Sequence, residues 1–516
     1  MWYNNFKLIN PREKYAGCRH ICLSEGGGMI DFNNLDKYRE NNRLEAKKAM
    51  GGLPKSIWET YSAFANTLGG IILLGVEESD DKSLHAVDLP DTEKLIKEFW
   101  DIVNNPNKTS VNILSGKDVY PMEVDGRHIV VINVPRADRS SKPVYIDGNP
   151  LNTYRRNGEG DYRCTKEEYQ AMVRDAAIRT PDMLLISNMD LSVINTDSLR
   201  GYRQRMKYSR PGHVWEQLDD EAFLQRIGAA GIGDDGQKHP TAAGLLMFGN
   251  EYDIVREFND YFLDYQEQYD AKNRWTDRII SSSGDWSGNV YDFFFRTYNK
   301  LQQDIKTPFK LDGITRIDDT PVHKALREAL ANCLVNADYY GRRGVVIIKK
   351  QKLITMANPG NMRIELDTAV SGGVSDPRNS TLLKMFNFID IGERAGSGIP
   401  NIYSVWRAEG WDSPDYEEQI NPDRTILSLP LSPEKTSDKK QAIKTGDKKT
   451  AISDKVKESI IIYLTDHPEG KTAVIAEYLN LSPSRTRNYL KELVDDGIVV
   501  AEGSSNKVRT YRLKGH

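Results

Sequence analysis

The chain of 516 residues has few cysteines, no long apolar run and no excess of basic residues. Four cysteines are too few for a disulfide framework in a chain of this length, and they fit a reducing cytoplasm. No apolar run approaches the ~20 residues that span a bilayer, so we expect no membrane association. Acidic residues outnumber basic ones, 74 to 70, so any binding to nucleic acid must come from a local patch.

The sequence also lacks the motifs of several enzyme classes. Its eight histidines are scattered and form no metal-ligating pair, and there is no catalytic triad pattern. The segment Glu469–Thr472 resembles the end of a Walker A motif. However, the residues before it predict a helix rather than the strand that this motif requires. The pattern therefore excludes a Walker-type ATPase.

What is present is a globular composition, 39% hydrophobic and 28% charged, in a chain long enough for several domains. We expect an α+β multidomain protein with six parts. They are an N-terminal extension, a first α/β domain, a connecting α/β region, a second α/β domain, a flexible Lys- and Asp-rich linker, and a C-terminal module of three helices and a hairpin. Their predicted bounds are 1–28, 29–180, 181–318, 319–430, 431–453 and 454–516.

Periodicity predicts the main elements. Apolar residues at helical spacing predict helices at 56–68, 91–103, 166–177 and 322–337. Unbroken apolar runs predict buried strands at 71–76 and 128–134, and the small-residue segment 241–249 is expected to lead into a strand. Thr165 and Glu168 form a capping box before the helix at 166–177. The segments 345–349 and 353–356 predict a hairpin.

A first group of residues with catalytic potential belongs to the first α/β domain. Glu40, Glu45 and Lys47 lie close together in the sequence, and Glu77 and Glu78 follow a predicted buried strand. Converging carboxylates can hold Mg²⁺ or Mn²⁺ through oxygen ligands. Such ions, with a lysine nearby, stabilise the charges that develop in phosphodiester cleavage. By spacing alone, a charged surface is the more common explanation for these residues.

The order of motifs over about residues 35–175 resembles the AlbA-2 domain of Schlafen-like proteins. The resemblance rests on Glu40-x4-Glu45-x-Lys47, on Asn66-Thr67-x-Gly69-Gly70 before a strand, and on Tyr154-Arg155-Arg156-Asn157-Gly158. It implies nucleic-acid binding, with contacts from Arg155 and Arg156. In some relatives three acidic residues cleave tRNA. Those positions would be Glu40, Glu45 and either Glu77 or Glu78, so the implied metal ligands are Glu40, Glu45 and Glu77.

A second group lies on the predicted helix at 322–337. Glu328, Asn332 and Asn336 are spaced i, i+4 and i+8, so they share one face of the helix. A Glu and Asn stripe among leucines suits a site where Asn holds Mg²⁺ on a triphosphate and Glu orients the attacking water. This stripe resembles the N-box of the GHKL ATP-binding fold, an α/β sandwich found in gyrase and histidine kinases.

The GHKL resemblance implies further contacts. The Gly-rich segment 392–399 precedes a predicted helix, where backbone N–H groups can approach phosphate. The family's Asp-x-Gly-x-Gly motif is replaced by Asn358-Pro359-Gly360, which favours ATP binding over hydrolysis. Glu328 would be catalytic in an ATPase, and Asn332 would reach Mg²⁺ through ATP. The implied nucleotide-binding residues are Glu328, Asn332, Asn336, Asn358, Gly360, Arg378, Asn379, Gly396, Ser397 and Gly398.

The C-terminal module resembles a winged helix-turn-helix. The side chains at the start of its predicted third helix could reach base edges in a major groove, and those on its hairpin could contact phosphates. Acidic residues near the end of that helix also fit a protein-binding role. The predicted nucleic-acid contacts are Arg485, Thr486, Asn488, Lys507 and Arg509.

Three functions follow from these modules. The first is a cytoplasmic, homo-oligomeric transcriptional regulator that binds ATP and DNA. The second is a metal-dependent nuclease acting on tRNA, other RNA or DNA, gated by ATP and used in phage defence. The third is an assembly protein that dimerises through the GHKL-like domain and docks a partner through the winged helix. We rank them in this order. Nucleic acid and ATP are ligands in the first two.

Overall fold

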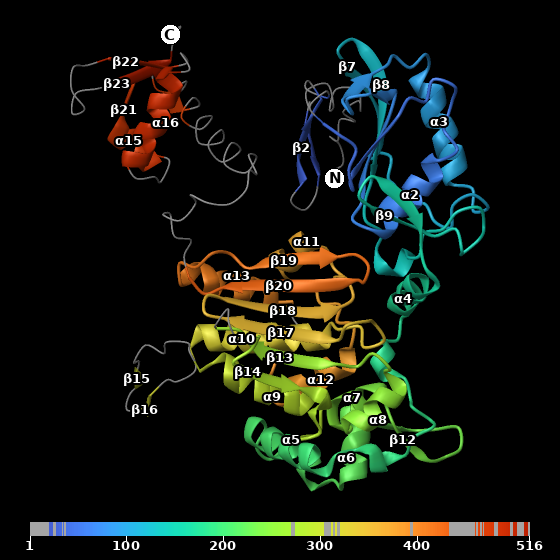
Figure 1. Ribbon diagram of the computed structural model, residues 1–516, viewed down its shortest axis with the longest axis vertical. Helices are drawn as coiled ribbons and strands as arrows, with labels where there is room; N and C mark the ends of the chain where they lie inside the picture. Colours follow the sequence, from blue (N-terminus) through green and yellow to red (C-terminus); the bar gives the residue numbers. More distant parts are fainter. Residues whose placement is uncertain are drawn as a thin grey trace, which may run out of the picture. The chain divides into compact units, whose positions relative to one another are not determined.

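A computed structural model describes much of the chain between residues 20 and 513 (Figure 1). The ranges it leaves undescribed between these limits are 24–26, 33–34, 36–37, 270–273, 304–310, 313–314, 317–319, 393–395, 433–459, 461–462, 465–466, 468, 479–482, 496–498 and 503–509. The chain divides into two compact units, residues 1–434 and 435–516. No helix in the described ranges is long and apolar enough to cross a membrane. The mixed α/β multidomain class predicted from the sequence is confirmed.

The first α/β domain is built on a four-stranded sheet. The strand order is β3-β4-β8-β7, with β3 parallel to β4 and the other pairs antiparallel. Every residue of β4 is buried, as its unbroken apolar run predicts. The bounds are β3 Leu44–Lys47, β4 Gly70–Leu74, β7 Val119–Val124 and β8 Arg127–Val134, with helices α2 Ile57–Asn66 and α3 Thr92–Val103.

Short hairpins surround this sheet. They pair β1 His20–Leu23 with β2 Gly27–Asp31, β5 Val76–Glu78 with β6 Leu84–Ala86, and β9 Tyr154–Asn157 with β10 Gly160–Arg163. The first hairpin crosses residue 28, where we expected an extension without strands to end. That expectation was wrong for residues 20–23 and 27–28, because Gly27 and Gly28 carry no apolar period although they lie in a paired strand.

Helix α4, Lys166–Ala176, closes the first domain and leads into the next region. Its capping box is confirmed: Glu168 N–H donates to the Thr165 hydroxyl at 3.2 Å, and Thr165 N–H donates to the Glu168 carboxylate at 2.7 Å. This reciprocal pair fixes where the helix starts. The position of α4 matters below because residues near its end contact the second α/β domain.

The connecting region contains a helix where we expected the approach to a strand. Residues Ala242–Phe248 form α7, and the Thr241 hydroxyl accepts from Gly244 N–H at 3.1 Å as its N-cap. All seven helical residues are buried, so the segment lacks the alternation of apolar and polar faces by which a helix is recognised in a sequence. The other elements are α5 Thr196–Ser209, α6 Asp220–Ile227, β11 Ala230–Ile232, β12 Lys238–Pro240 and α8 Glu251–Glu257.

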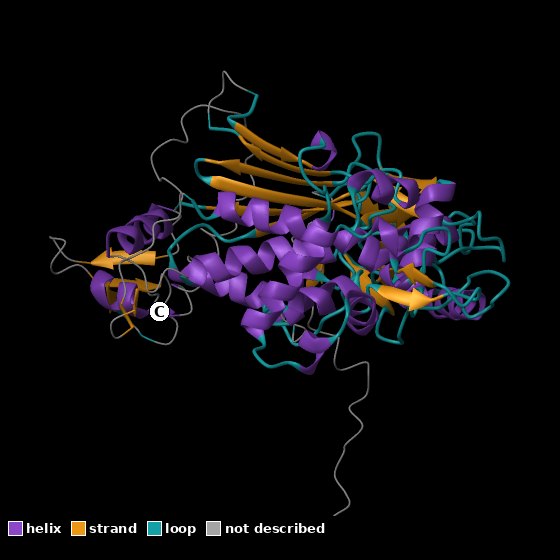
Figure 2. Ribbon diagram, turned by 90° about the horizontal axis from the view of Figure 1, so that it is seen from below, coloured by secondary structure: helices purple, strands orange, loops and turns teal. Residues whose placement is uncertain are grey.

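A six-stranded sheet forms the second α/β domain, and helices lie against one of its faces (Figure 2). The strand order is β14-β13-β17-β18-β20-β19, with only the β13–β17 pair parallel among these strands. The strands are β13 Leu263–Glu267, β14 Asp277–Ile280, β17 Val345–Lys350, β18 Leu353–Pro359, β19 Asp415–Gln419 and β20 Arg424–Pro430. Because β13 and β14 precede residue 319, the predicted boundary there divides one continuous sheet.

The helices of this domain supply its core. They are α9 Val290–Leu301, α10 Pro321–Val335, α11 Leu366–Ser371, α12 Ser380–Phe388 and α13 Gly398–Ala408. In β17 and β18 buried residues alternate with half-buried or exposed ones, as expected for a sheet with helices on one face. The remaining short elements of this unit are β15 Leu311–Asp312 and β16 Thr315–Arg316, with the 3₁₀ turns η2 Arg139–Ser141, η3 Pro181–Met183, η4 Leu191–Val193, η5 Val214–Gln217 and η6 Ser281–Ser283.

The second unit is a small helical module with a three-stranded sheet. Its described elements are β21 Gly470–Lys471, α15 Thr472–Tyr478, α16 Pro483–Asp495, β22 Val499–Glu502 and β23 Thr510–Leu513, and the strand order is β21-β23-β22. Ile475 and Leu490 are buried in its core. Two of the three predicted helices, α15 and α16, and the predicted hairpin of β22 and β23 are thus confirmed. Most of the helix expected at 456–465 lies outside the described residues.

Candidate functional site

The predicted nucleotide residues converge on one pocket in the second α/β domain. The pocket is open to solvent, and the empty space within it, open solvent included, is about 970 Å³. Its wall is formed by α10, by β18 and the loop after it, and by the start of α13. From the predicted set it includes Glu328, Asn332, Asn336, Asn358, Arg378, Gly396 and Gly398.

Helix α10 presents its polar stripe to this pocket. Thr320 caps the helix and Pro321 occupies its first turn, where a missing N–H costs little. The three stripe residues lie on one face, as predicted. Asn332 Nδ2 lies 3.3 Å from Glu328 Oε1, and Asn336 Nδ2 donates to the Asn332 carbonyl at 3.0 Å. These bonds fix the direction of the amide groups.

The start of helix α13 faces Glu328. A Cβ on Gly398 would lie 2.1 Å from Glu328 Oε1, so the carboxylate fits only because residue 398 is glycine. Gly396 has a φ of +66°, and a Cβ there would lie 2.5 Å from the Val374 carbonyl oxygen. A carboxylate at a helix N-terminus interacts favourably with the helix dipole. Glu328 therefore lies beside the N-terminus, the part of a helix that binds phosphate in other proteins.

Three residues predicted to contact nucleotide do not line this pocket: Gly360, Asn379 and Ser397. Gly360 has a φ of +90°, and a Cβ there would lie 2.6 Å from Arg378 Nη1, so its role is to admit that side chain. Asn379 is buried and donates to the Val335 and Ala337 carbonyls at 2.9 and 2.7 Å, which satisfies the end of α10. We therefore correct both assignments to structural roles. Glu393, Arg394 and Ala395 of the Gly-rich segment lie outside the described residues.

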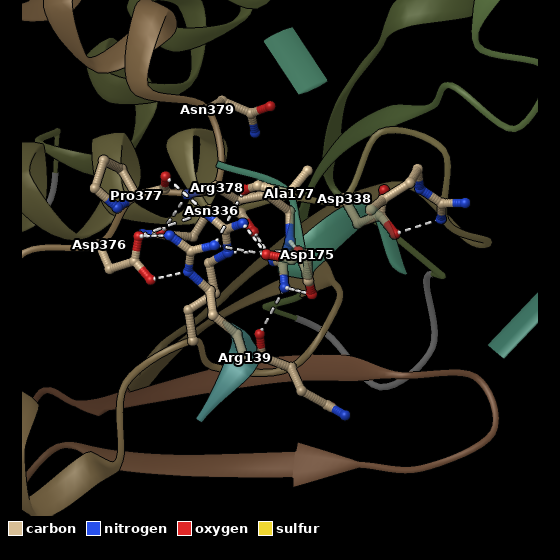
Figure 3. Close-up of polar contacts among 12 residues, drawn as sticks. Arg139, Asp175, Ala177, Asn336, Asp338, Asp376, Pro377, Arg378 and Asn379 are labelled. Carbon is tan, nitrogen blue, oxygen red and sulfur yellow. Dashed lines mark hydrogen bonds and ion pairs between the residues drawn. The ribbon is translucent and has the colours of Figure 1, made fainter. Parts of the chain in front are cut away.

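Arg378 connects the pocket to the first α/β domain (Figure 3). Its guanidinium donates to both carboxylate oxygens of Asp175 on α4, at 2.9 Å each. The same guanidinium donates to the backbone carbonyls of Asn336 and, at 2.9 Å, of Asn361. The buried Arg378 side chain therefore joins the C-terminal end of α10 to α4, through an acid that lies 203 positions before Arg378 in the sequence.

Two more arginines converge on the end of α4. Arg139 and Arg363 donate to the Asp175 carbonyl at 2.7 and 2.9 Å, and Arg139 also pairs with Asp376 (Figure 3). Burial by itself raises the pKa of Asp175, but Arg378 and then Arg363 outweigh it and lower the pKa below its ordinary value. Asp175 is therefore ionised in the folded protein. The three arginines also stabilise the C-terminal end of α4, which is the negative end of the helix dipole.

The acidic residues of the first domain are arranged differently. Glu45 is buried and its carboxylate forms ion pairs with Lys47 and, at 2.7 Å, with Arg156. Glu40 Oε1 accepts the Ala46 N–H at 2.9 Å. Burial raises the pKa of Glu40, and repulsion from Glu45 and Glu78 adds to this, while the Ala46 N–H lowers it.

The predicted metal site is not formed. Among the residues that the structure describes, no three His, Cys, Asp or Glu side chains are grouped to hold a metal ion. Glu77 is exposed and pairs with Lys48 at 2.8 Å, and Glu78 is exposed as well. Glu40, Glu45 and Glu77 are therefore not arranged as a metal ligand set in this structure, where Glu45 forms ion pairs with Lys47 and Arg156.

Arg155 and Arg156 were predicted to contact nucleic acid, but both are buried. Arg155 pairs with Asp423 at 2.7 Å, and Arg156 pairs with Glu45 and with Asp161 at 3.0 Å. Their guanidinium groups are used inside the protein and present no charge to a ligand on the surface. We therefore correct both predictions.

In the second unit the outward face of α16 differs from the predicted one. Thr486 is buried together with Leu490 and Leu493, so its side chain does not reach a base. Arg487 and Lys491 are exposed instead. The side chains of Arg485 and Asn488, and the residues Lys507 and Arg509, lie outside the described part of the chain.

Comparison with protein families places these features in known domain types. One family model, "Schlafen, AlbA_2", matches residues 40–165. The chain contains a Schlafen AlbA_2 domain. A model for "Putative ATP-dependent DNA helicase recG C-terminal" matches residues 345–426, and "Winged helix-turn-helix DNA-binding" matches residues 453–500. A "Domain of unknown function (DUF8451)" matches residues 170–264, most of the region that we expected only to connect two domains. The match at 345–426 covers the β18 and α13 sides of the pocket but not α10.

Two solved structures are similar to this AlbA_2 protein. The N-terminal domain of a RecG-related protein from Nitrosomonas europaea, titled a putative ATP-dependent DNA helicase, is 32% identical over 26% of this chain and 90% of that chain, with a TM-score of 0.21. The DIP2311 protein from Corynebacterium diphtheriae is 16% identical over 92% of each chain, with a TM-score of 0.39. The search of curated proteins gives no match.

Several residues of the site were missed by the sequence prediction. The pocket has an apolar wall that includes Met356, Ile364, Leu383 and Leu427. Every second side chain of β18 and β20 points to the buried face of the sheet. This alternation in the sequence could have predicted that Met356 and Leu427 face inward. Asp175 had no such signal, because its partner Arg378 lies in another domain.

Proposed function

We propose that this AlbA_2 protein binds ATP in the pocket between α10 and α13 and acts as a nucleotide-responsive DNA-binding regulator. The observation that carries the proposal is the convergence of predicted residues from α10, β18, the Arg378 loop and the start of α13 on a single pocket. A family model that names an ATP-dependent helicase C-terminal region also matches three of these segments, all except α10.

The chemistry of the pocket suits a nucleotide at both ends. Met356, Leu383 and Leu427 supply apolar surface for a flat base. Gly396 and Gly398 leave the backbone near the α13 N-terminus open to phosphate oxygens. These groups therefore offer separate environments for the base and for the phosphates.

Magnesium would enter with the triphosphate. The carbonyl oxygen of Asn332 and the carboxylate of Glu328 are hard oxygen ligands of the type that Mg²⁺ prefers. Mg²⁺ would neutralise phosphate charge that Glu328 would otherwise repel. Asn332 would hold the metal, and Glu328 would orient a water molecule if hydrolysis takes place.

The DNA-binding part of the proposal rests on the second unit. A winged helix-turn-helix model matches residues 453–500, and α16 exposes Arg487 and Lys491 one turn apart on the same face. Basic side chains on such a face can contact DNA phosphates or base edges. Replacing both by Ala should weaken duplex binding and reduce the salt slope by ~1 per lost phosphate contact.

The alternative, a metal-dependent nuclease, has less support. It needs a set of free carboxylates, whereas Glu45 is paired with Lys47 and Arg156. We expect labelled tRNA and DNA to remain intact when incubated with the full chain and Mn²⁺, with or without ATP. Cleavage that disappears in Glu45→Ala would instead establish the nuclease.

The nucleotide proposal is tested by titrating the full chain with a fluorescent ATP analogue and Mg²⁺. Wild type should bind saturably, and Asn332→Ala should bind at least about tenfold more weakly, which corresponds to ~1.4 kcal/mol. Asn401→Ala is the matched control, because Asn401 is an exposed residue of α13 outside the pocket. Equal binding by all three proteins, or none by wild type, would refute the proposal.

A further inference from the structure

A second cavity lies between the AlbA_2 domain and the second α/β domain, and no predicted function uses it. Its empty volume is about 1240 Å³. It is bordered by α4, by the segment around η2, and by the loops that contain Asn361 and Asp423. Asn361, Met362 and Arg363 line both this cavity and the nucleotide pocket, so one short loop separates the two.

The lining of this junction cavity is rich in cations. Its basic residues are Arg136, Arg139, Lys142, Arg155, Arg174, Arg342 and Arg363, and its acidic residues are Glu167, Glu168, Asp175, Asp338 and Asp423. Each of these arginines has a carboxylate within ion-pair distance. The partners are Glu418, Asp376, Asp423, Asp338, Glu167 and Asp175.

Lys142 is the exception among the basic residues of the lining. No carboxylate of the described residues lies within 4.0 Å of its Nζ, and its one hydrogen bond to the described protein is to the Asn66 carbonyl, at 3.1 Å. An ammonium group has three N–H donors, so two remain for a ligand. The side chain is only partly exposed, which limits how well water can replace a missing partner.

The charged groups around Lys142 also leave its ammonium group without a compensating carboxylate. Burial, together with repulsion from Arg136 and Arg155, lowers the pKa of Lys142 to about 7, although Glu418 and Asp423 act in the opposite direction. Those two acids are already paired with the two arginines. The protonated form of Lys142 therefore lacks a compensating carboxylate among the described side chains, and a bound anion would supply the missing negative charge.

We propose that the junction cavity is an anion site in which Lys142 binds the phosphate group of a small phosphorylated molecule. A phosphate brings two negative charges and several acceptor oxygens to the unused N–H donors. The cavity is larger than phosphate alone, so the ligand would carry a further group. This site is distinct from the nucleotide pocket and does not depend on ATP binding there.

The experiment uses the full chain with Asn332→Ala, which weakens binding in the nucleotide pocket. Inorganic phosphate and pyrophosphate are titrated separately by calorimetry. The Asn332→Ala protein and its Lys142→Arg derivative should bind saturably, whereas Lys142→Met should bind at least about tenfold more weakly. Lys97→Met is the matched control, because Lys97 is exposed on α3 away from the cavity.

Folding of Lys142→Met is checked by thermal unfolding without added anion. Removal of an uncompensated buried charge should raise its unfolding temperature above that of the parent, and phosphate should raise the unfolding temperature of the parent only. Absence of saturable binding of either anion to the parent would overturn the proposal, as would equal binding by Lys142→Met. A loss of duplex DNA binding without a loss of phosphate binding would also overturn it, since it would place Lys142 in a nucleic-acid site.

Discussion

The acidic cluster of the AlbA_2 domain and the polar stripe of α10 look alike as sequence patterns, but the folded protein uses them in opposite ways. Glu45 forms ion pairs with Lys47 and Arg156, so its carboxylate interacts with side chains of its own domain. Asn332 and Asn336 line a pocket with an apolar wall. The difference shows that the partners of a polar residue, more than its type or spacing, decide whether it can bind a ligand.

The largest expected effect comes from the residue that joins the two regions. Asp175→Ala leaves the buried Arg378 without its carboxylate, so it should lower the free energy of unfolding by about 3 kcal/mol, the lower end for a broken buried ion pair. Chemical denaturation measures this loss. Asp101→Ala, on the exposed side of α3, should change stability by less than about 0.5 kcal/mol. An equally small effect for Asp175→Ala would show that the contact in Figure 3 does not bear on stability.

The next prediction compares the two regions directly. Glu45→Ala should cost about 2 kcal/mol, because hydrogen-bonded charges are lost from a buried position. Asn332→Ala should cost less than about 1 kcal/mol, since Asn332 is half-buried and Ala favours a helix. Denaturant titration of both variants measures the order. A reversed order would mean that the pocket residues hold the fold and the acidic cluster is free for function.

A smaller effect is expected from Glu328→Gln. The carboxylate lies against Gly398 at the start of α13, where it repels phosphate. Removing the charge should tighten ATP binding roughly two- to fivefold, or ~0.3–1 kcal/mol, when Mg²⁺ is low. Titration of the fluorescent analogue measures the change. Weaker binding by the variant would indicate that Glu328 holds Mg²⁺ rather than opposing the phosphates.

The smallest effect concerns pH and Glu40. Its pKa in the folded protein is raised above 4.5, so the protonated carboxyl favours the native state. This contribution to stability is fully present below the pKa that Glu40 has in the unfolded chain. It is lost as the pH rises through the pKa of Glu40 in the folded protein. Glu40→Gln should therefore gain stability relative to wild type as the pH rises from below 4.5 into the neutral range. A constant difference across this range would show that Glu40 titrates normally.

Local features of the fold could be predicted from the sequence where one element carries the whole signal. The capping box of α4, the buried strand β4 and the stripe on α10 are confirmed for this reason. Helix α7 was not predicted as a helix, because all its residues are buried and the sequence therefore shows no amphipathic period.

Contacts between distant segments could not be predicted. Arg155, Arg156 and Arg378 appear in the sequence as free cations, but their carboxylate partners Asp423, Glu45 and Asp175 become neighbours only in the folded chain. The same reason explains Thr486, whose burial depends on the packing of α16 rather than on its position near the helix start. Sequence spacing therefore located the pocket beside α10 better than it located charged surfaces.

The contacts at the end of α4 also affect how such proteins can exchange parts during evolution. The AlbA_2 match ends at residue 165, immediately before α4, whereas three arginines from other segments bind near residue 175. A junction near residue 165 would separate Arg139 from Asp175 but would keep Asp175 with Arg363 and Arg378, whereas a junction after Ala177 would separate Asp175 from both of these arginines. Inheritance of this domain should therefore keep α4 and the arginines as one unit, and chimeras joined after Ala177 should express worse than those joined near residue 165.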